Sequence, residues 1–339
     1  MKIKRQELVD VLMAIKPGLA QKAIVDQATH FIFTGKRVLT YNDRICISYP
    51  FKTDFSCSVS AEEFYKILNK ISDDDIIVEF NEGVLKIGGL KVKAALTTGT
   101  GETILSFVES LDLDNVPNRA KKLPDDFKEA IKLCLFSASS NMSTPALTCL
   151  FIHDDLVAST DDLRISEYKM KRSMGCSVLI PASSVVELIK FEIVKFAVAE
   201  GKTWIYFLTK EGAIFCSRLI DVEFPDYAQF LEGINKESIM LPDDMNRLVE
   251  TASILAEEAG NNQEVEIQIG NGRLKCKGQN KIGWIESESR IQTKRSAKFV
   301  IVASFFLDIL NHTHTMFFDE NKALFNSKEF RHVIALKGE

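Results

Sequence analysis

The chain has 339 residues and a formal net charge of −5, with 42 lysines and arginines against 47 aspartates and glutamates. This length exceeds one ordinary core and suits two or three domains of about 100–150 residues. No apolar run approaches the roughly 20 residues of a membrane span, and charged residues interrupt the N-terminus, where a signal peptide is apolar. The seven cysteines are scattered without a C-x-x-C pair, so we expect reduced thiols in a cytoplasmic protein. The acidic balance disfavours a simple basic nucleic-acid binder, although charge can be segregated by surface.

A first predicted helix opens the chain and recurs twice. In RQELVDVLMAI, apolar residues repeat with a 3.6-residue period from Leu8 onward, which indicates one buried helix face. The same pattern starts at Phe127 in PDDFKEAIKLC and at Met245 in PDDMNRLVETA, after steps of 119 and 118 residues. The proline and paired aspartates before these two copies are typical of a helix N-terminus.

A second predicted helix recurs with even more regular spacing. The stretches SAEEFYKIL, PASSVVELI and VASFFLDIL each place apolar residues at i, i+3, i+4 and i+7. Their patterns begin at Ala61, Ala182 and Ala303, which are 121 residues apart in both steps. In the middle copy this periodicity predicts that Val185 and Val186 are both buried.

Strand-like runs punctuated by turns separate the helices. HFIFTGKRVLTYNDRICISY and its two counterparts each indicate strand, tight turn, strand, turn and strand, and similar runs follow each second helix. Each copy is therefore predicted to be an α+β domain with two helices and antiparallel sheets. The predicted domains span residues 1–118, 119–238 and 239–339, and a period above 100 residues is too long for a solenoid unit. The simpler alternative is a tandem array without special geometry.

Similar domains joined head to tail through strand edges can close into a ring, which removes the exposed edges. If helices line the inside at roughly 9 Å spacing, the six helices of one chain enclose a hole of only about 17 Å. Twelve helices from two chains enclose about 34 Å by the same spacing. Duplex DNA is roughly 20 Å across, with a major groove of about 12 Å. A closed homodimer could therefore encircle double-stranded DNA, whereas one chain could not.

The polar faces of the predicted helices carry basic side chains interrupted by acidic ones. Such a mixed lining favours sliding along phosphates over tight binding, because each phosphate contact adds salt-sensitive affinity. The alternative is that these residues form ordinary solvated helix faces. The basic residues predicted to contact DNA are Lys4, Arg5, Lys16, Lys22, Lys66, Lys70, Lys128, Lys132, Lys190 and Arg247.

One segment shows a resemblance to a known protein family in addition to the periodic patterns. FCSRLIDVEFPDYAQFL resembles the closing strand and linker of the middle domain in bacterial DNA sliding clamps, the beta subunit of DNA polymerase III holoenzyme. VASTDDLRISEYKM and VLIPASSVVELIKF resemble family stretches upstream of it, and the resemblance is strongest over residues 147–231. The shorter chain and divergent outer copies raise the hypothesis of a phage- or plasmid-encoded member.

The resemblance implies three DNA-clamp domains per chain and a ring-shaped homodimer. It implies a processivity factor that encircles double-stranded DNA without sequence preference and tethers the replicative polymerase and other DNA-processing partners. An ATP-dependent clamp loader would open the ring, and the clamp itself would be no enzyme and would need no cofactor.

The resemblance also implies a hydrophobic cleft that takes a partner peptide, a glutamine followed by aliphatic and aromatic residues. Asp162, Leu163 and Ala335 depart from the family pattern, in which glycine, histidine and a larger methionine are common. By position, the cleft residues are Ala146, Leu147, Thr160, Asp162, Leu163, Arg164, Ile165, Pro225, Phe230, Val333 and Ala335.

For the dimer contact, the resemblance points to an edge strand of the first domain and the first-helix region of the third. These positions are Ala94 and Leu96 in KAALTT, and Ile254 and Leu255 in ASILAE. The alternative for Ile254 and Leu255 is a place in an ordinary core.

Two other functions, an enzyme and an interaction scaffold, compete with the clamp interpretation. An enzyme has little support, because H-E-x-x-H, G-x-S-x-G and P-loop motifs are absent, and we predict no catalytic or metal-ligating residues. The stronger rival is a multi-domain protein-interaction scaffold that does not encircle DNA. It predicts the same domains without ring closure.

Overall fold

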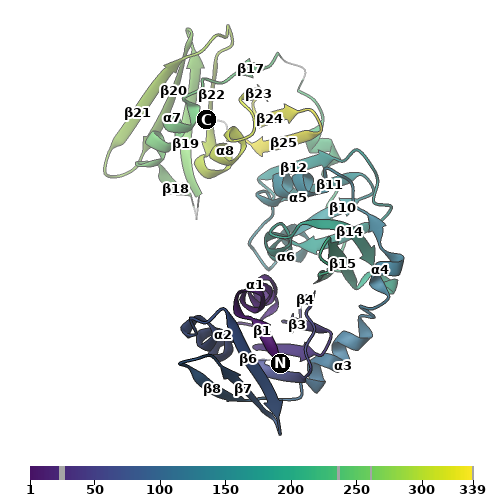
Figure 1. Cartoon of the computed structure of the whole chain (residues 1–339). Coiled ribbons are helices and arrows are strands. Elements are labelled where there is room, and N and C mark those ends of the chain that lie inside the picture. The colour runs from purple at the N-terminus through teal and green to yellow at the C-terminus, as the bar shows by residue number, and fades with distance from the viewer. Residues whose placement is uncertain (23–26, 235–236, 260–261, 338–339) are drawn as a thin grey trace. The chain divides into compact units, whose positions relative to one another are not determined.

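The structure, a computed structural model, describes residues 1–22, 27–234, 237–259 and 262–337 (Figure 1). These residues form an α+β fold that divides into two compact units. Unit 1 comprises Met1–Leu123 and Ser183–Asp221, and unit 2 comprises Pro124–Ala182 and Val222–Glu339. Among the described residues, none of the helices combines the length and apolar character that a membrane span requires.

All six helices predicted from the repeat are present. The first-helix set is α1 (Arg5–Ile15), α5 (Phe127–Leu135) and α7 (Met245–Ser253). The second-helix set is α2 (Ala61–Lys70), α6 (Ala182–Leu188) and α8 (Ala303–Leu310). The described residues add α3 (Glu102–Ser110), α4 (Val116–Arg119) and the short 3-10 turns η1 (Lys16–Gly18), η2 (Pro145–Thr148), η3 (Glu200–Lys202) and η4 (Ala228–Leu231).

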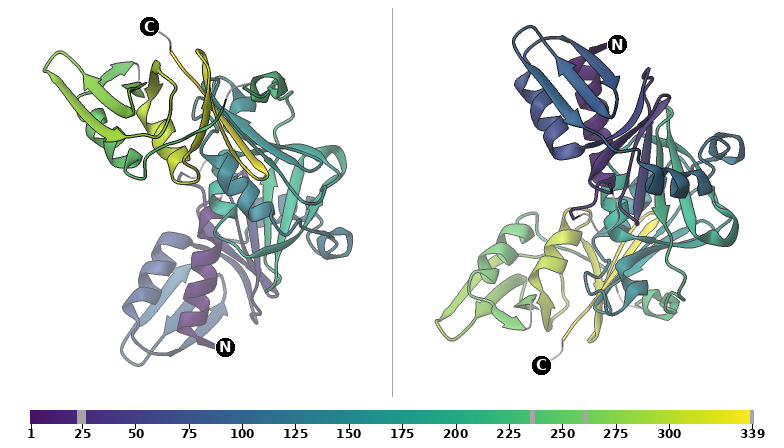
Figure 2. Two further views of the ribbon diagram at one scale, coloured as in Figure 1. Left: turned by 90° about the horizontal axis from the view of Figure 1, so that it is seen from above. Right: turned by 90° about the horizontal axis from the view of Figure 1, so that it is seen from below.

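The buried helix faces follow the predicted period, although Tyr65, Ala182, Ile189 and Leu307 are only half-buried and one residue is exposed. In α1, Leu8, Leu12 and Ile15 are buried as expected, and α1 packs beside α2 (Figure 2). The prediction for α6 was wrong at Val186, which is 42% exposed, because Ser184 and Leu188 are buried instead. The sequence here contains two overlapping stripes that share Val185, and the period alone does not choose between them.

Unit 1 contains two antiparallel sheets. The eight-stranded sheet has the order β5-β2-β3-β4-β16-β15-β14-β9, and the four-stranded sheet has the order β1-β6-β7-β8. The first comprises β2 (His30–Thr34), β3 (Arg37–Tyr41), β4 (Ile45–Pro50), β5 (Ser56–Ser60), β9 (Lys121–Lys122), β14 (Ile193–Val198), β15 (Trp204–Thr209) and β16 (Ile214–Arg218). The second comprises β1 (Lys2–Lys4), β6 (Asp75–Asn81), β7 (Val84–Gly88) and β8 (Lys93–Thr97).

Unit 2 repeats this plan. Its eight-stranded sheet has the order β13-β10-β11-β12-β25-β24-β23-β17, and its second sheet has the order β18-β19-β20-β21, with β22 also paired to β19. The first comprises β10 (Cys149–His153), β11 (Leu156–Thr160), β12 (Arg164–Lys169), β13 (Ser177–Pro181), β17 (Ile239–Met240), β23 (Thr315–Phe318), β24 (Lys322–Ser327) and β25 (Phe330–Ala335). The second comprises β18 (Glu257–Ala259), β19 (Asn262–Gly270), β20 (Arg273–Gln279), β21 (Trp284–Arg290) and β22 (Ala297–Val302).

Each eight-stranded sheet consists of two halves that join through one antiparallel pair, which we call a joint. In unit 1, β4 pairs with β16 and Cys46 lies opposite Cys216. In unit 2, β12 pairs with β25 and Ile165 lies opposite Val333. The joints give hydrogen-bond partners to strand edges that would otherwise be open. Because each unit combines halves from segments far apart in the sequence, the division into three domains stays a prediction.

The same side-chain turn precedes β4, β12 and β21. Asn42, Asp161 and Asn280 each accept hydrogen bonds, through Oδ1, from the backbone N–H groups two and three residues ahead. The three residues are spaced by 119 positions in both steps. This turn gives a structural alignment in which β21 corresponds to β4 and β12.

A buried histidine lies in the unit 2 joint. His332 is fully buried on β25, opposite Ser166, and its Nδ1 is 2.9 Å from the Ser166 hydroxyl. Burial, reinforced by the nearby positive charge of Arg164, lowers the pKa of His332 to about 3. In the unit 1 joint the same pair of positions holds Phe215 and Ile47.

We predict that this histidine makes unit 2 less stable in mild acid. The unfolded chain takes up the proton near the ordinary histidine pKa of about 6.5, whereas the folded chain does so only near 3. The contribution of His332 to the unfolding free energy is therefore constant above pH 6.5. It falls with decreasing pH by up to about 1.4 kcal/mol per pH unit until the folded pKa is reached.

Urea unfolding between pH 4 and 8 measures this effect. The variant S166I/H332F, which copies the unit 1 pair, should depend less on pH than the wild type. An equal pH dependence in the two proteins would contradict the prediction.

Candidate functional site

The predicted cleft centres on the outer face of the unit 2 joint, the face away from α5. Ile165 and Val333 are buried there in a cluster with Ala158, Leu324 and Leu231. The segment 222–234, which contains η4, covers this cluster and contributes Tyr227 and Phe224 as well. The structure thus brings the predicted Ile165 and Val333 together, beneath the segment that contains the predicted Pro225 and Phe230.

Exposed apolar side chains lie at the border of this cluster. Phe230 on η4 is 51% exposed and Leu163 is 41% exposed. The N–H of Ala335 donates to the carbonyl of Leu163 at 2.8 Å, so the turn before β12 lies against the end of β25. Lys322 Nζ donates at 3.0 Å to the carbonyl of Phe230 and holds η4 near β24.

The turn at 160–164 is fixed by its own side chains. The Thr160 hydroxyl donates to the carbonyl of Arg164 at 2.8 Å and accepts from the N–H of Asp162 at 3.2 Å. Asp162 has φ of +73°, a conformation that glycine adopts easily and aspartate tolerates better than most residues. An aspartate can therefore occupy this position with Leu163 still exposed.

Arg164 is directed differently from the other predicted cleft residues. Its guanidinium donates to Asp161 at 2.9 Å and to Asp308 on α8 at 2.7 Å. It also lies 3.9 Å from the ring centroid of Phe305. Strand alternation places Arg164 on the opposite face from Ile165, so it ties the joint to α8 and does not line the cluster. The sequence carried no signal for Asp308 or Phe305, which are more than 140 residues away.

The remaining predicted cleft residues occupy separate positions. Pro225 is exposed on the covering segment. Ala146 and Leu147 lie on η2, where Leu147 is buried and Ala146 is half-buried.

Unit 1 fills the positions that are small or polar in unit 2. The joint alignment makes Tyr41, Trp204 and Arg218 equivalent to Thr160, Lys322 and Ala335. Phe107 of α3 packs on Tyr41 with ring centroids 4.4 Å apart, and Arg218 lies 5.0 Å from the Trp204 ring. The outer face of the unit 1 joint is therefore closed by its own chain, while unit 2 has smaller side chains at these three positions.

A charge pair between the exposed Arg331 and the buried Glu167 fixes the joint beneath the covering segment. Arg331 Nε donates to Glu167 at 3.1 Å across β12 and β25. The Tyr227 hydroxyl donates to the same carboxylate at 2.8 Å. Burial, together with the Glu167 charge, raises the pKa of Tyr227, so its hydroxyl stays protonated and can donate.

Several residues predicted to contact DNA already have partners. Lys4 pairs with Asp75 at 2.8 Å, Lys190 pairs with Glu187 at 2.6 Å, and Lys66 pairs with Glu62. Lys16 lies 5.7 Å from the Tyr65 ring, and Arg5 donates at 3.5 Å to a backbone carbonyl. Lys128 is half-buried, and the exposed members of the set outside these interactions are Lys22, Lys70, Lys132 and Arg247.

The smaller sheets also have outer strands with a single strand partner among the described residues, and two of these bear on the predicted dimer contact. They are β8, the last strand of its sheet in unit 1, and β21, the last strand of its sheet in unit 2. Ala94 and Leu96 are half-buried on β8. Ile254 is 69% exposed, so the alternative that places it in an ordinary core is wrong. Leu255 is half-buried, and its Cδ1 lies 4.0 Å from where a Cβ on Gly283 would stand, just before β21.

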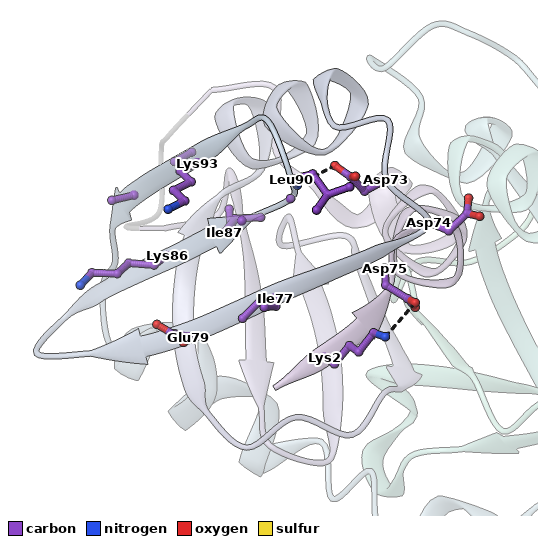
Figure 3. Close-up of a pocket in the computed structure, with 14 residues that line it drawn as sticks. Lys2, Asp73, Asp74, Asp75, Ile77, Glu79, Lys86, Ile87, Leu90 and Lys93 are labelled. Carbon is purple, nitrogen blue, oxygen red and sulfur yellow. Dashed lines mark hydrogen bonds and ion pairs between the residues drawn. The ribbon is translucent and has the colours of Figure 1, made fainter.

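A pocket of about 1000 Å³ lies on the open face of β6, β7 and β8 (Figure 3). Ile77 and Ala95 line it together with charged residues such as Lys86. The face is hollow at Gly88, because a Cβ there would meet no atom within 4 Å. The N–H of Leu90 donates to Asp73 at 3.1 Å and fixes the loop that borders the pocket.

Comparisons with known proteins agree on the fold. No protein-family model matches the sequence. A curated beta sliding clamp from Rickettsia felis is 25% identical over 200 residues, which are 54% of this chain and 51% of that protein. The chain thus spans about half the length of this curated relative.

Solved structures match over nearly the whole chain. A DnaN sliding clamp from Bartonella birtlesii, bound to griselimycin, is 18% identical with a TM-score of 0.85, covering 99% of this chain and 98% of that one. The beta subunit from DNA polymerase of Streptococcus pyogenes is 18% identical with a TM-score of 0.85, covering 100% and 99%. A sliding clamp from Bacillus subtilis is also 18% identical, with a TM-score of 0.83 and coverage of 100% and 98%. This chain has the fold of the bacterial sliding clamps.

Proposed function

We propose that this protein is a DNA sliding clamp, a cytoplasmic and non-catalytic processivity factor with three domains per chain. Two copies close into a ring around duplex DNA and tether the replicative polymerase and other DNA-processing partners. The clamp fold supports this proposal, and a single observation carries it. The two joints share one register, and the outer strands β8 and β21 occupy the positions that the two strands of a joint occupy in each unit. A scaffold that never encircles DNA gives no reason for these edges to match.

The repeat predicts how the free edges pair. In the two existing joints, the N–H of Arg218 donates to the carbonyl of Arg44 and that of Ala335 to Leu163, both at 2.8 Å. β8 corresponds to β16 and β25, because each is the strand paired to the third strand of its half-sheet. The equivalent bond in a third joint would run from Thr97 of one copy to Ile282 of the other. β8 and β21 would thus close the ring twice per dimer.

The same register brings opposite charges together. It places Lys93 opposite Glu286, the positions that Arg331 and Glu167 hold in the unit 2 joint. Glu286 already pairs with Lys275 at 2.8 Å, and its carboxylate has acceptor sites for a second cation. Ala94 and Leu96 would face the helix side, toward Ile254 and Leu255 of the other copy. Charge and apolar pattern both favour this register.

The helices supply the surface proposed to face DNA. The exposed residues Lys70, Lys132 and Arg247 lie on α2, α5 and α7, at the polar sides of their amphipathic patterns. Because Lys4, Lys66 and Lys190 pair with carboxylates, the helices offer few exposed cations outside ion pairs. Binding would then be weak at any one phosphate and insensitive to base sequence.

The outer face of the unit 2 joint supplies the proposed partner site. Phe230, Leu163 and the small Ala335 border an apolar cluster, which is the usual form of a site that takes a short apolar peptide. Polymerase and an ATP-dependent clamp loader would dock there through such peptides.

The dimer is tested by I254K/L255K. Burying two ammonium groups at a strand joint is unfavourable, so we predict a folded monomer where the wild type is a dimer. Sedimentation velocity and small-angle X-ray scattering measure mass and the hollow-ring profile. The control is V222K, at another exposed apolar residue, which should stay dimeric. An unchanged dimer in I254K/L255K would refute the assigned interface.

DNA encirclement is tested by retention on DNA. The dimer, loaded with a bacterial clamp loader and ATP, should stay on nicked circular duplex and be lost when the circle is linearised, because a ring slides off free ends. K70E/K132E/R247E should shorten retention at about 50 mM salt more than at 200 mM, because charge screening weakens phosphate contacts at higher salt. Equal retention on both DNA forms would favour direct binding without encirclement.

The partner site is tested with a peptide that carries glutamine followed by aliphatic and aromatic residues. L163A/F230A should weaken its binding at least about tenfold by calorimetry, because such anchors carry most of the affinity. M142A, at an exposed residue of the same unit, is the control. Unchanged affinity in L163A/F230A would place the site elsewhere.

A further inference from the structure

The outer face of each existing joint is covered by a chain segment that lies outside the sheet. In unit 1, α3 covers Cys46 and Cys216, which are fully buried. In unit 2, the segment 222–234 covers Ile165 and Val333. Both covers exclude water from the centre of a joint, where the cross-strand pair is apolar.

The free edges carry a different pair at the same positions. The turn alignment makes Trp284 on β21 equivalent to Cys46 and Ile165, and the pairing of β8 with β7 makes Ala95 equivalent to Cys216 and Val333. Trp284 is 64% exposed, and Ala95 is exposed within the pocket on β6, β7 and β8. Among the described residues, neither is covered by a segment like those over the two joints.

The side-chain directions agree with this equivalence. The hydroxyl of Ser287 donates to the carbonyl of Leu248 on α7, so odd-numbered residues of β21 face the helix and Trp284 faces outward. Lys277 of the neighbouring strand lies 6.0 Å from the Trp284 ring on that outer side. On the other edge, Lys86 lies opposite Ala95 on the outer, pocket face.

We propose that Trp284 of one copy seats in this pocket of a second copy and supplies the cover that α3 and the 222–234 segment give the other joints. The inference rests on the proposed pairing of β8 with β21. In that register Trp284 lies opposite Ala95, at a cross-strand Cβ separation of about 5 Å. The hollow at Gly88 and the exposed Ile77 receive the indole, and Lys86 and Lys277 flank it from either side. The second copy thereby completes a site that each chain alone leaves half-built.

Tryptophan fluorescence tests this assignment directly, because the sequence contains only Trp204 and Trp284. In W204F, Trp284 is the sole reporter. On dilution across the dimer–monomer transition, measured in parallel by sedimentation, its acrylamide quenching should rise at least about threefold and its emission should shift to the red. If W204F fails to fold, the difference between wild-type and W284F emission gives the same readout.

Two variants complete the test. A95E should weaken dimerisation at least about tenfold and abolish the emission change on dilution, because it fills the pocket with a charge. W284A should weaken dimerisation, whereas M142A, at a residue of nearly equal exposure, should not.

The outcomes separate this inference from the ring itself. A dimer in which Trp284 is quenched as strongly as in the monomer would overturn the Trp284 assignment and leave ring closure intact. A monomer at every concentration would overturn both. A protected Trp284 in a monomer would overturn the second copy as its partner.

Discussion

The fold depends on one constraint, which is that the inner edges of its half-sheets need hydrogen-bond partners. The chain meets it twice by joining β4 to β16 and β12 to β25 with the same residue-by-residue register. Each joint is then reinforced in its own way: an ion pair between the buried Glu167 and Arg331 in unit 2, and an apolar pair of cysteines in unit 1. Among the outer strands, β8 and β21 occupy the positions of joint strands, and they have complementary charge and pattern. The proposed function follows from this geometry, because a head-to-tail joint repeated with one register favours closure.

The two joints also show how one framework acquires a binding site at a single place. In unit 1, the aromatic side chains of Tyr41, Trp204 and Phe107 close the outer face. In unit 2, threonine and lysine replace the tyrosine and the tryptophan, and the covering segment leaves Phe230 and Leu163 exposed. The proposed partner site is therefore the joint whose outer face is less completely covered. The strands of the two joints pair in the same register, so the difference lies in the side chains and the covering segments.

Much of the fold was predictable from sequence, because periodic burial and spacing are local signals. The six helices and the meander strands followed from patterns repeated about every 120 residues. The prediction that Val186 is buried was wrong because two apolar stripes overlap in α6. The site was less predictable, since Arg164 binds Asp308 from 144 positions away and α3 was not among the predicted helices. Strand register and long-range charge pairing depend on tertiary context, which periodicity does not encode.

The interleaving of the two units has a consequence for synthesis on the ribosome. Unit 1 begins with the first residues, yet β16, which completes its larger sheet, ends at Arg218. Until that strand emerges, β4 is an open edge on a nascent chain, and β12 stays open until β25, at the very end of the described chain, is made. Such edges can pair wrongly with other chains. Neighbouring ribosomes on one message would therefore carry mutually adhesive intermediates, and slow elongation between the halves would favour aggregation over folding.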